Sequence, residues 1–241
     1  FKNLAQTKNS SSDISPTAGQ MPRLVGLAYA SKLFRNNPGL SAYTELSTAG
    51  NEIAFGTIGN ASTSEGHFFE AINAAGVLQV PMLISVWDDE YGISVPAEYQ
   101  TTKGSISKIL AGFQRTKTEK GYEIFTVKGW DYLTLITTYE KAEKVCREEH
   151  VPVLVHVTEM TQPQGHSTSG SHERYKSKER LAWETEFDCI RKLRLWLIEN
   201  GAASSEELDG IEKGAKATAR AAKEAAWKDF NKDIQKAQKE L

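Results

Sequence analysis

The sequence from residue 52 to residue 92, EIAFGTIGNASTSEGHFFEAINAAGVLQVPMLISVWDDEYG, predicts a strand, a turn, a helix and a second strand in succession. The apolar runs at 52–58 and 81–87 have the length and composition of buried strands. Between them, Ser62 and Glu65 have the spacing of a capping box, which predicts that a helix begins there. A strand-turn-helix-strand unit of this kind is the building block of α/β folds.

Two further apolar runs, at 122–127 and 151–157, predict two more strands, with helical periodicity between them. The run at 151–157 is apolar on both faces, as expected when helices cover both sides of a parallel sheet. The sequence therefore predicts an α/β fold with a doubly wound, mostly parallel sheet.

The C-terminal part of the chain is charged and helical in character. Ser204 and Glu207 form a second capping-box pattern, and apolar residues then recur every three or four positions to the end. This pattern predicts one long amphipathic helix. We expect an α/β domain at 1–179 and a C-terminal helical extension at 180–241.

Composition excludes several classes of protein. The chain has 241 residues and a formal net charge of −2, which argues against a polybasic protein that binds nucleic acid or membrane surfaces. It lacks an apolar run long enough to span a membrane, so no membrane partner is expected. The two cysteines show no metal or disulfide spacing, which favours the cytoplasm. The polar start without Met suggests a piece of a longer protein.

Polar residues follow two of the predicted strands, at the edge where open α/β sheets bind ligands. The turn 59–62, Gly-Asn-Ala-Ser, opens a helix and suits a phosphate, although such residues are also common in ordinary strand-to-helix turns. The turn 88–90 carries three carboxylates, which suits Mg²⁺ or Ca²⁺ but also an ordinary acidic loop. Asn60 and Asp89 could face each other across one crevice.

These residues resemble a known cofactor motif. Gly59-Asn60-Ala61 followed by 88–94, DDEYGIS, resembles the thiamine diphosphate motif. The stretches 15–23, SPTAGQMPR, and 165–169, GHSTS, resemble the alpha subunit of the thiamine-dependent 2-oxo acid dehydrogenases, the decarboxylating component. The similarity covers nearly the whole chain and implies the thiamine diphosphate-binding fold, with an N-terminal portion of a typical alpha subunit missing.

The resemblance implies a Mg²⁺ site made by the side chains of Asn60 and Asp89 and the backbone carbonyl of Tyr91. The family has Asp at the first position and Asn at the second, so the carboxylate and the amide are exchanged here and the formal charge is kept. Ala61 and Ser62, in the turn, would offer backbone N–H groups to the diphosphate, and Gly59 is also assigned to the cofactor site. Ala61 replaces a glycine, which would weaken binding if that position requires a positive φ.

Three further residues are assigned by the same resemblance. His166 resembles the histidine of the family's active-site loop and would act in catalysis and contact the cofactor, since an imidazole can donate to a phosphate or a developing oxyanion. Ser15 and Thr17 match positions near the aminopyrimidine ring. His156, on an apolar strand, is interpreted as a core histidine.

The implied function is oxidative decarboxylation of a 2-oxo acid, branched-chain or pyruvate, followed by acyl transfer to a lipoyl group on an acyltransferase partner. The family's activating glutamate comes from a beta-type domain or subunit, so we expect a homo- or hetero-oligomer and an inactive chain when it is alone. Two alternatives remain: a catalytically silent subunit that dimerises without cofactor, and an unrelated phosphate-binding α/β enzyme.

Overall fold

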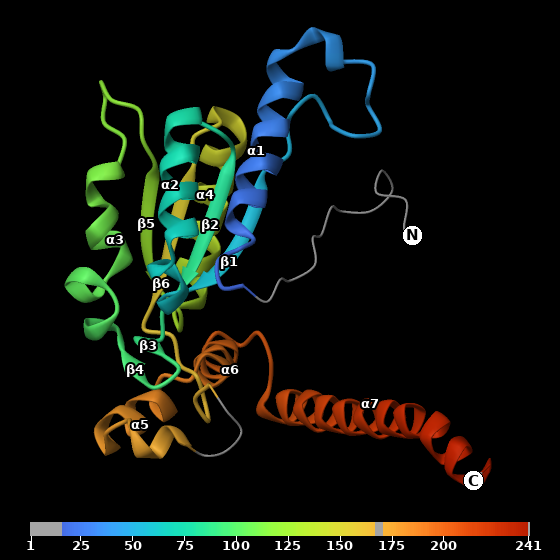
Figure 1. Cartoon of the computed structure of the whole chain (residues 1–241). Coiled ribbons are helices and arrows are strands. Elements are labelled where there is room, and N and C mark those ends of the chain that lie inside the picture. Colours follow the sequence, from blue (N-terminus) through green and yellow to red (C-terminus); the bar gives the residue numbers. More distant parts are fainter. Residues whose placement is uncertain (1–15, 167–170, 241) are drawn as a thin grey trace. The chain divides into compact units, whose positions relative to one another are not determined.

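The structure is a computed structural model that describes residues 16–166 and 171–240 (Figure 1). Its contacts divide the chain into two compact units, one ending at Lys192 and the other beginning at Leu193. The first unit contains the sheet and the second contains the long C-terminal helix. The expected domain boundary at 179/180 stays a prediction.

The first unit is built on a four-stranded sheet with the strand order β1-β2-β6-β5. All three strand pairs are parallel, which confirms the predicted class of fold. A short antiparallel hairpin, β3-β4, follows β2. The strands are β1 (Ala54–Gly59), β2 (Met82–Trp87), β3 (Tyr91–Gly92), β4 (Val95–Pro96), β5 (Glu123–Lys128) and β6 (Val153–Thr158).

Helices connect and cover these strands (Figure 1). The α-helices are α1 (Met21–Asn36), α2 (Gly66–Leu78), α3 (Ile106–Ile109), α4 (Tyr132–Glu149), α5 (Lys178–Glu186), α6 (Cys189–Glu199) and α7 (Ser205–Glu240). The 3-10 helices are η1 (Pro38–Leu40), η2 (Ala61–Ser64), η3 (Ala97–Tyr99), η4 (Thr102–Gly104), η5 (Leu110–Phe113) and η6 (Ser171–Arg174).

Two hydrophobic clusters occupy opposite faces of the sheet. On one face, residues of α1, α2 and α3 pack against side chains such as Ile84 and Val86 of β2. On the other face, Ala142 and Cys146 of α4 pack against Leu83 and its neighbours in β6. Since successive side chains of a strand point to opposite faces, the continuous apolar runs of β2 and β6 supply both clusters.

The predicted capping box of Ser62 and Glu65 is wrong. Ser62 lies inside the 3-10 helix η2, and α2 begins only at Gly66, after a Glu65 whose side chain makes no cap bond. The chain turns tightly after β1 because Thr63 donates both its N–H and its hydroxyl to the Asn60 carbonyl. This turn leaves Glu65 extended and delays the helix by one turn.

The second capping box is confirmed. The N–H of Ser204 donates to the Glu207 carboxylate at 2.8 Å, and the N–H of Glu207 donates to the Ser204 hydroxyl at 3.1 Å. The predicted long helix follows as α7, which has no buried residue. In the two described ranges, no helix has the length and apolar character needed to cross a membrane.

Candidate functional site

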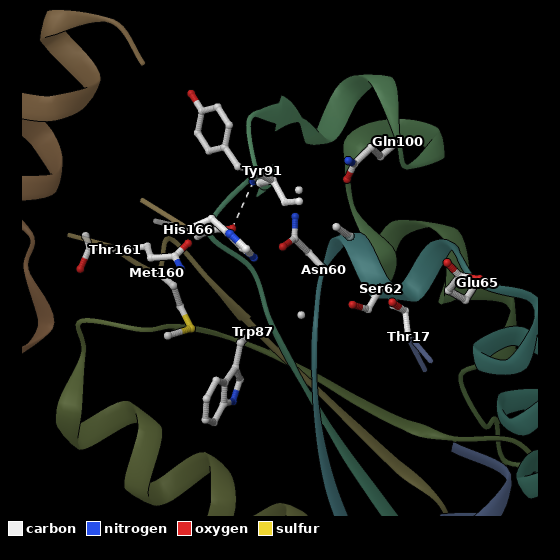
Figure 2. Close-up of a pocket in the computed structure, with 16 residues that line it drawn as sticks. Thr17, Asn60, Ser62, Glu65, Trp87, Tyr91, Gln100, Met160, Thr161 and His166 are labelled. Carbon is white, nitrogen blue, oxygen red and sulfur yellow. Dashed lines mark hydrogen bonds between the residues drawn. The ribbon is translucent and has the colours of Figure 1, made fainter. Parts of the chain in front are cut away.

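A cavity of about 650 Å³ lies at the carboxyl ends of β1, β2 and β6. Its walls come from four places in the chain: the segment before α1, the turn after β1, the stretch from the end of β2 to Gln100, and the segment after β6. The lining residues are Thr17, Gly59, Asn60, Ala61, Ser62, Glu65, Trp87, Asp89, Tyr91, Gly92, Ile93, Gln100, Met160, Thr161, Gln162 and His166 (Figure 2). The cavity therefore lies where open α/β sheets bind ligands.

Backbone hydrogen bonds hold the strand ends together beyond the regular sheet. The N–H of Asn60 donates to the Trp87 carbonyl at 3.0 Å, and the N–H of Asp88 donates to the Val157 carbonyl at 2.9 Å. The N–H of Met160 donates in turn to the Asp88 carbonyl at 3.1 Å. The three turns that line the cavity are thus extensions of one parallel ladder, which fixes their relative positions.

Asn60 is the most informative of the lining residues. It is only 6% exposed, and its side-chain Nδ2 is a buried donor with no hydrogen-bond partner among the described residues. Leaving such a donor unpaired costs about 1–3 kcal/mol. Figure 2 shows the Asn60 side chain and the His166 ring projecting toward the middle of the labelled residues, whereas the Tyr91 ring projects away from it. The amide therefore needs an acceptor that a ligand could supply.

Asp89 is one of two carboxylates, with Glu65, among the residues that line the cavity. Burial raises the pKa of its carboxyl group, and the Tyr91 N–H, at 3.2 Å from Oδ1, together with the charge of Lys176, partly opposes this shift. A bound cation would favour the ionised form still further. Asp89 thus has the chemistry of a cation ligand in a partly desolvated site.

The three carboxylates of residues 88–90 do not act as one cluster. Asp88 is buried, and its Oδ2 lies 2.8 Å from Nε2 of His156, whose Nδ1 lies 2.9 Å from the Ser107 hydroxyl. Glu90 points elsewhere and pairs with Arg180. Over the described parts of the chain, no group of three or more His, Cys, Asp and Glu side chains is spaced for a metal ion. His156 is therefore a core histidine, as predicted.

The backbone of Ala61 is not strained. Ala61 lies in η2 and is not among the residues with positive φ, so the expected penalty for replacing a glycine does not arise. A lining position that does require a glycine is Gly92. A Cβ on Gly92 would lie 2.7 Å from Cβ of Ala61 and would overlap the amide of Gln100. That amide has a buried Oε1 with no partner among the described residues, a second unpaired group on the cavity wall.

The structure brings together every predicted site residue that it describes. Thr17, Gly59, Asn60, Ala61, Ser62, Asp89, Tyr91 and His166 all line the one cavity, and Ser15 lies outside the described residues. The backbone N–H of His166 hydrogen-bonds to Tyr175, and Gly165 before it has a φ of 65°. The roles assigned to these residues stay predictions.

Sequence reasoning missed several lining residues, notably Glu65, Trp87, Gln100 and the segment 160–162. Trp87 and residues 160–162 could have been found, because they end or follow predicted strands at the ligand edge. Gln100 carries no such signal. It follows η3, a short helix without a distinctive pattern.

The fold and the cavity define an α/β protein with a polar ligand site at the carboxyl edge of a parallel sheet. Comparison with known sequences identifies the particular family. The chain belongs to the family described as dehydrogenase E1 component, whose sequence model matches residues 4–235.

Curated relatives are alpha subunits of such enzymes. The mitochondrial 2-oxoisovalerate dehydrogenase subunit alpha of Dictyostelium discoideum is 29% identical over 222 residues, which are 91% of this chain and 45% of the relative. The pyruvate dehydrogenase E1 component subunit alpha of Rickettsia bellii (strain RML369-C) is 26% identical and covers 73% of this chain and 51% of the relative. The resemblance to an alpha-type component is confirmed, and the chain spans about half the length of the curated relatives it matches.

Among solved structures, transketolase from Campylobacter jejuni subsp. jejuni NCTC 11168 aligns with 80% of this chain and 32% of its own, with 14% identity and a TM-score of 0.42.

Proposed function

We propose that this chain is the alpha-type part of a thiamine diphosphate-dependent 2-oxo acid dehydrogenase and binds the diphosphate of the cofactor through Mg²⁺. The observation that carries the proposal is the pair Asn60 and Asp89. One is a buried amide donor without a partner and the other is a carboxylate with a raised pKa, and both line a cavity at the ligand edge of the sheet.

The donor set of the cavity fits Mg²⁺ and a diphosphate. Asp89 would supply the negatively charged oxygen, and Asn60 Oδ1 and the Tyr91 carbonyl would supply neutral ones, since Mg²⁺ prefers hard oxygen ligands. The Asn60 Nδ2 group would then donate to a phosphate oxygen. Backbone N–H groups of η2, which begins at Ala61, would complete the contact with the diphosphate.

Bound thiamine diphosphate would supply a thiazolium ring that accepts the electrons released when a 2-oxo acid loses carbon dioxide. The residues of this chain would bind and orient the cofactor at one end. His166, which lines the same cavity, would donate a hydrogen bond to a phosphate or to the developing oxyanion. The half-exposed Trp87 ring would cover apolar surface of the bound molecule.

Catalysis would need partners. A beta-type domain or subunit would supply the activating glutamate, and a lipoyl-bearing acyltransferase would accept the acyl group. We therefore expect this chain to be inactive alone and to function in an oligomer. Relatives act, by their names, on 2-oxoisovalerate or pyruvate, and both substrate types stay open here. The cytoplasmic location stays a prediction.

Calorimetry tests this proposal directly. Thiamine diphosphate would be titrated into the chain, alone and together with the beta-type domain, in the presence and absence of Mg²⁺. We expect saturable binding that requires Mg²⁺ and that Asp89→Ala abolishes. Ser41→Ala, on an exposed residue away from the cavity, is the control. Absence of binding even with the partner would contradict the proposal and favour a silent structural subunit.

A further inference from the structure

The turn that joins β2 to β3 carries Asp89 and leads into Tyr91, the first residue of β3, and its backbone is in an unfavourable conformation. Glu90, at its centre, has a φ of 68°, in the left-handed region that residues with a side chain avoid. Hydrogen bonds within the turn, from the Glu90 N–H to Asp88 and from the Tyr91 N–H to Asp89, favour this conformation locally. A contact from elsewhere in the fold is needed to hold it firmly.

One arginine of α5 supplies that contact. Nη2 of Arg180 donates to the Asp89 carbonyl at 2.9 Å, and Nη1 donates to the Glu90 carboxylate. Its guanidinium carbon also lies 5.4 Å from the centre of the Tyr91 ring. A single side chain, about 90 positions further along the sequence, therefore contacts two residues of the turn and the tyrosine that follows them. The guanidinium is suited to this because its five donors are fixed in one plane.

A buried ion pair holds Arg180 in place. Nε of Arg180 donates to Glu184 Oε1 at 2.9 Å, and Nζ of Lys176 donates to the same oxygen at 2.7 Å. The Lys176 and Glu184 side chains are 1% and 6% exposed, and Lys176 lies 5.1 Å from the centre of the Tyr91 ring. The side chain of Arg180 is itself only 16% exposed. The contact with Glu184 thus holds the guanidinium group in place, with its two Nη atoms at the turn.

We propose that Arg180 is a positioning residue for the cofactor site. It holds the turn so that Asp89 and Tyr91 keep the conformation in which they line the cavity, and it acts without touching the ligand. One consequence of this inference, weaker Mg²⁺ binding when Arg180 is replaced, rests on the proposed function. Replacing a residue that contacts a metal ligand, rather than the metal itself, typically lowers metal affinity by about 10- to 100-fold.

Arg180 can be replaced without leaving a buried charge unpaired. In Arg180→Met the buried Lys176 and Glu184 still neutralise each other, and Glu90, 57% exposed, is left in contact with water. No buried charge is left without a partner, so we expect the fold to survive. Arg191→Met is the matched control, because Arg191 is exposed and donates to the carbonyl of Thr185 rather than to the turn.

The test has two readouts on the full chain. Hydrogen exchange of the free protein would follow peptides that contain residues 88–93, and calorimetry with the beta-type domain present would give the Mg²⁺ concentration that half-saturates thiamine diphosphate binding. For Arg180→Met we expect exchange in these peptides to be about tenfold faster. The half-saturating Mg²⁺ concentration should rise about tenfold, with the melting curve close to that of Arg191→Met. Arg180→Lys, which keeps the charge but not the fork of donors, should recover only part of the change.

Equal exchange at 88–93 in Arg180→Met and Arg191→Met would overturn the inference, and so would an unchanged Mg²⁺ requirement. A wild-type chain that takes up no cofactor would instead overturn the proposed function. Exchange in the free protein would then still decide whether Arg180 holds the turn.

Discussion

At the scale of single residues, Asn60 combines a cost in stability with a use in binding. Its buried Nδ2 has no partner among the described residues, a state that is expensive in the free protein and useful only when an acceptor arrives. Groups of this kind are typical of ligand sites, where local rules of stability are broken for function.

Replacing Asn60 should therefore separate stability from binding. In Asn60→Ala the unpaired donor is removed from a site that is 6% exposed, so we expect the free energy of unfolding to rise by about 1 kcal/mol. Cofactor binding should fall sharply in the same variant. Urea denaturation and calorimetry measure the two effects. A loss of stability of more than about 1 kcal/mol would contradict this account.

His150 provides a pH-dependent prediction outside the site. Burial lowers the pKa of this histidine below its ordinary value of 6.5, although its hydrogen bond to the Gly50 carbonyl partly opposes the shift. The folded chain holds His150 neutral, and the unfolded chain takes up the proton first. The contribution of His150 to the free energy of unfolding is therefore fully present above about pH 6.5, and it is lost as the pH falls below that value.

We expect His150→Asn to reduce the slope of unfolding free energy against pH between about pH 6.5 and pH 5. Asparagine tolerates the left-handed conformation that His150 adopts at the end of α4, with a φ of 53°, and it does not titrate. Urea denaturation across this range gives the slope. The exposed residue His67, replaced by Asn, is the control, and an identical slope in both variants would refute the prediction.

At the scale of elements, the β3-β4 hairpin depends on a close approach to η2. Gly92 in β3 leaves no room for a side chain beside Ala61 and Gln100. Both neighbours line the cavity, so any displacement of the hairpin changes the shape of the site.

Gly92→Ala should therefore lower both stability and cofactor affinity. Overpacking of this kind costs about 1–3 kcal/mol. Gly112→Ala is the matched control, since a Cβ there meets nothing within 4 Å. Thermal unfolding should show a lower melting temperature for Gly92→Ala than for the control, and calorimetry should show a lower cofactor affinity. Equal values in the two variants would show that the hairpin shifts to accommodate the extra methyl group.

The capping box of α7 is an element whose contribution can be measured alone. Ser204→Ala removes the side-chain acceptor of the Glu207 N–H, which costs about 1 kcal/mol at a helix start. We expect faster hydrogen exchange in the first turn of α7 and no change in the sheet. Ser205→Ala, one residue further along, is the comparison, and equal exchange in the two variants would argue against the cap.

At the scale of the whole molecule, both hydrophobic clusters are formed by residues of the first unit. The long helix α7 contributes no buried residue to either cluster. A chain that ends at Asn200 should therefore keep a cooperative unfolding transition within about 1 kcal/mol of the full chain, since little apolar surface is lost. Circular dichroism and urea denaturation check this, and loss of cooperativity would show that α7 supports the sheet.

The sequence alone determined the class of fold, the positions of the four main strands along the chain, the long C-terminal helix and the cavity residues that lie just past the ends of strands. These features follow from local periodicity, from capping patterns and from the rule that parallel strands present their carboxyl ends at one edge. Asn60 and Asp89 were found in this way because each lies just past the end of a predicted strand.

Only the tertiary structure decided which neighbours these residues meet. It separated Asp88, buried against His156, from Asp89 in the cavity, although the two are adjacent in sequence. It brought Gln100 to the cavity and Arg180 to the turn across long separations. Contacts of this kind have no period and no local signal, because they depend on packing between elements that the chain joins only after many residues.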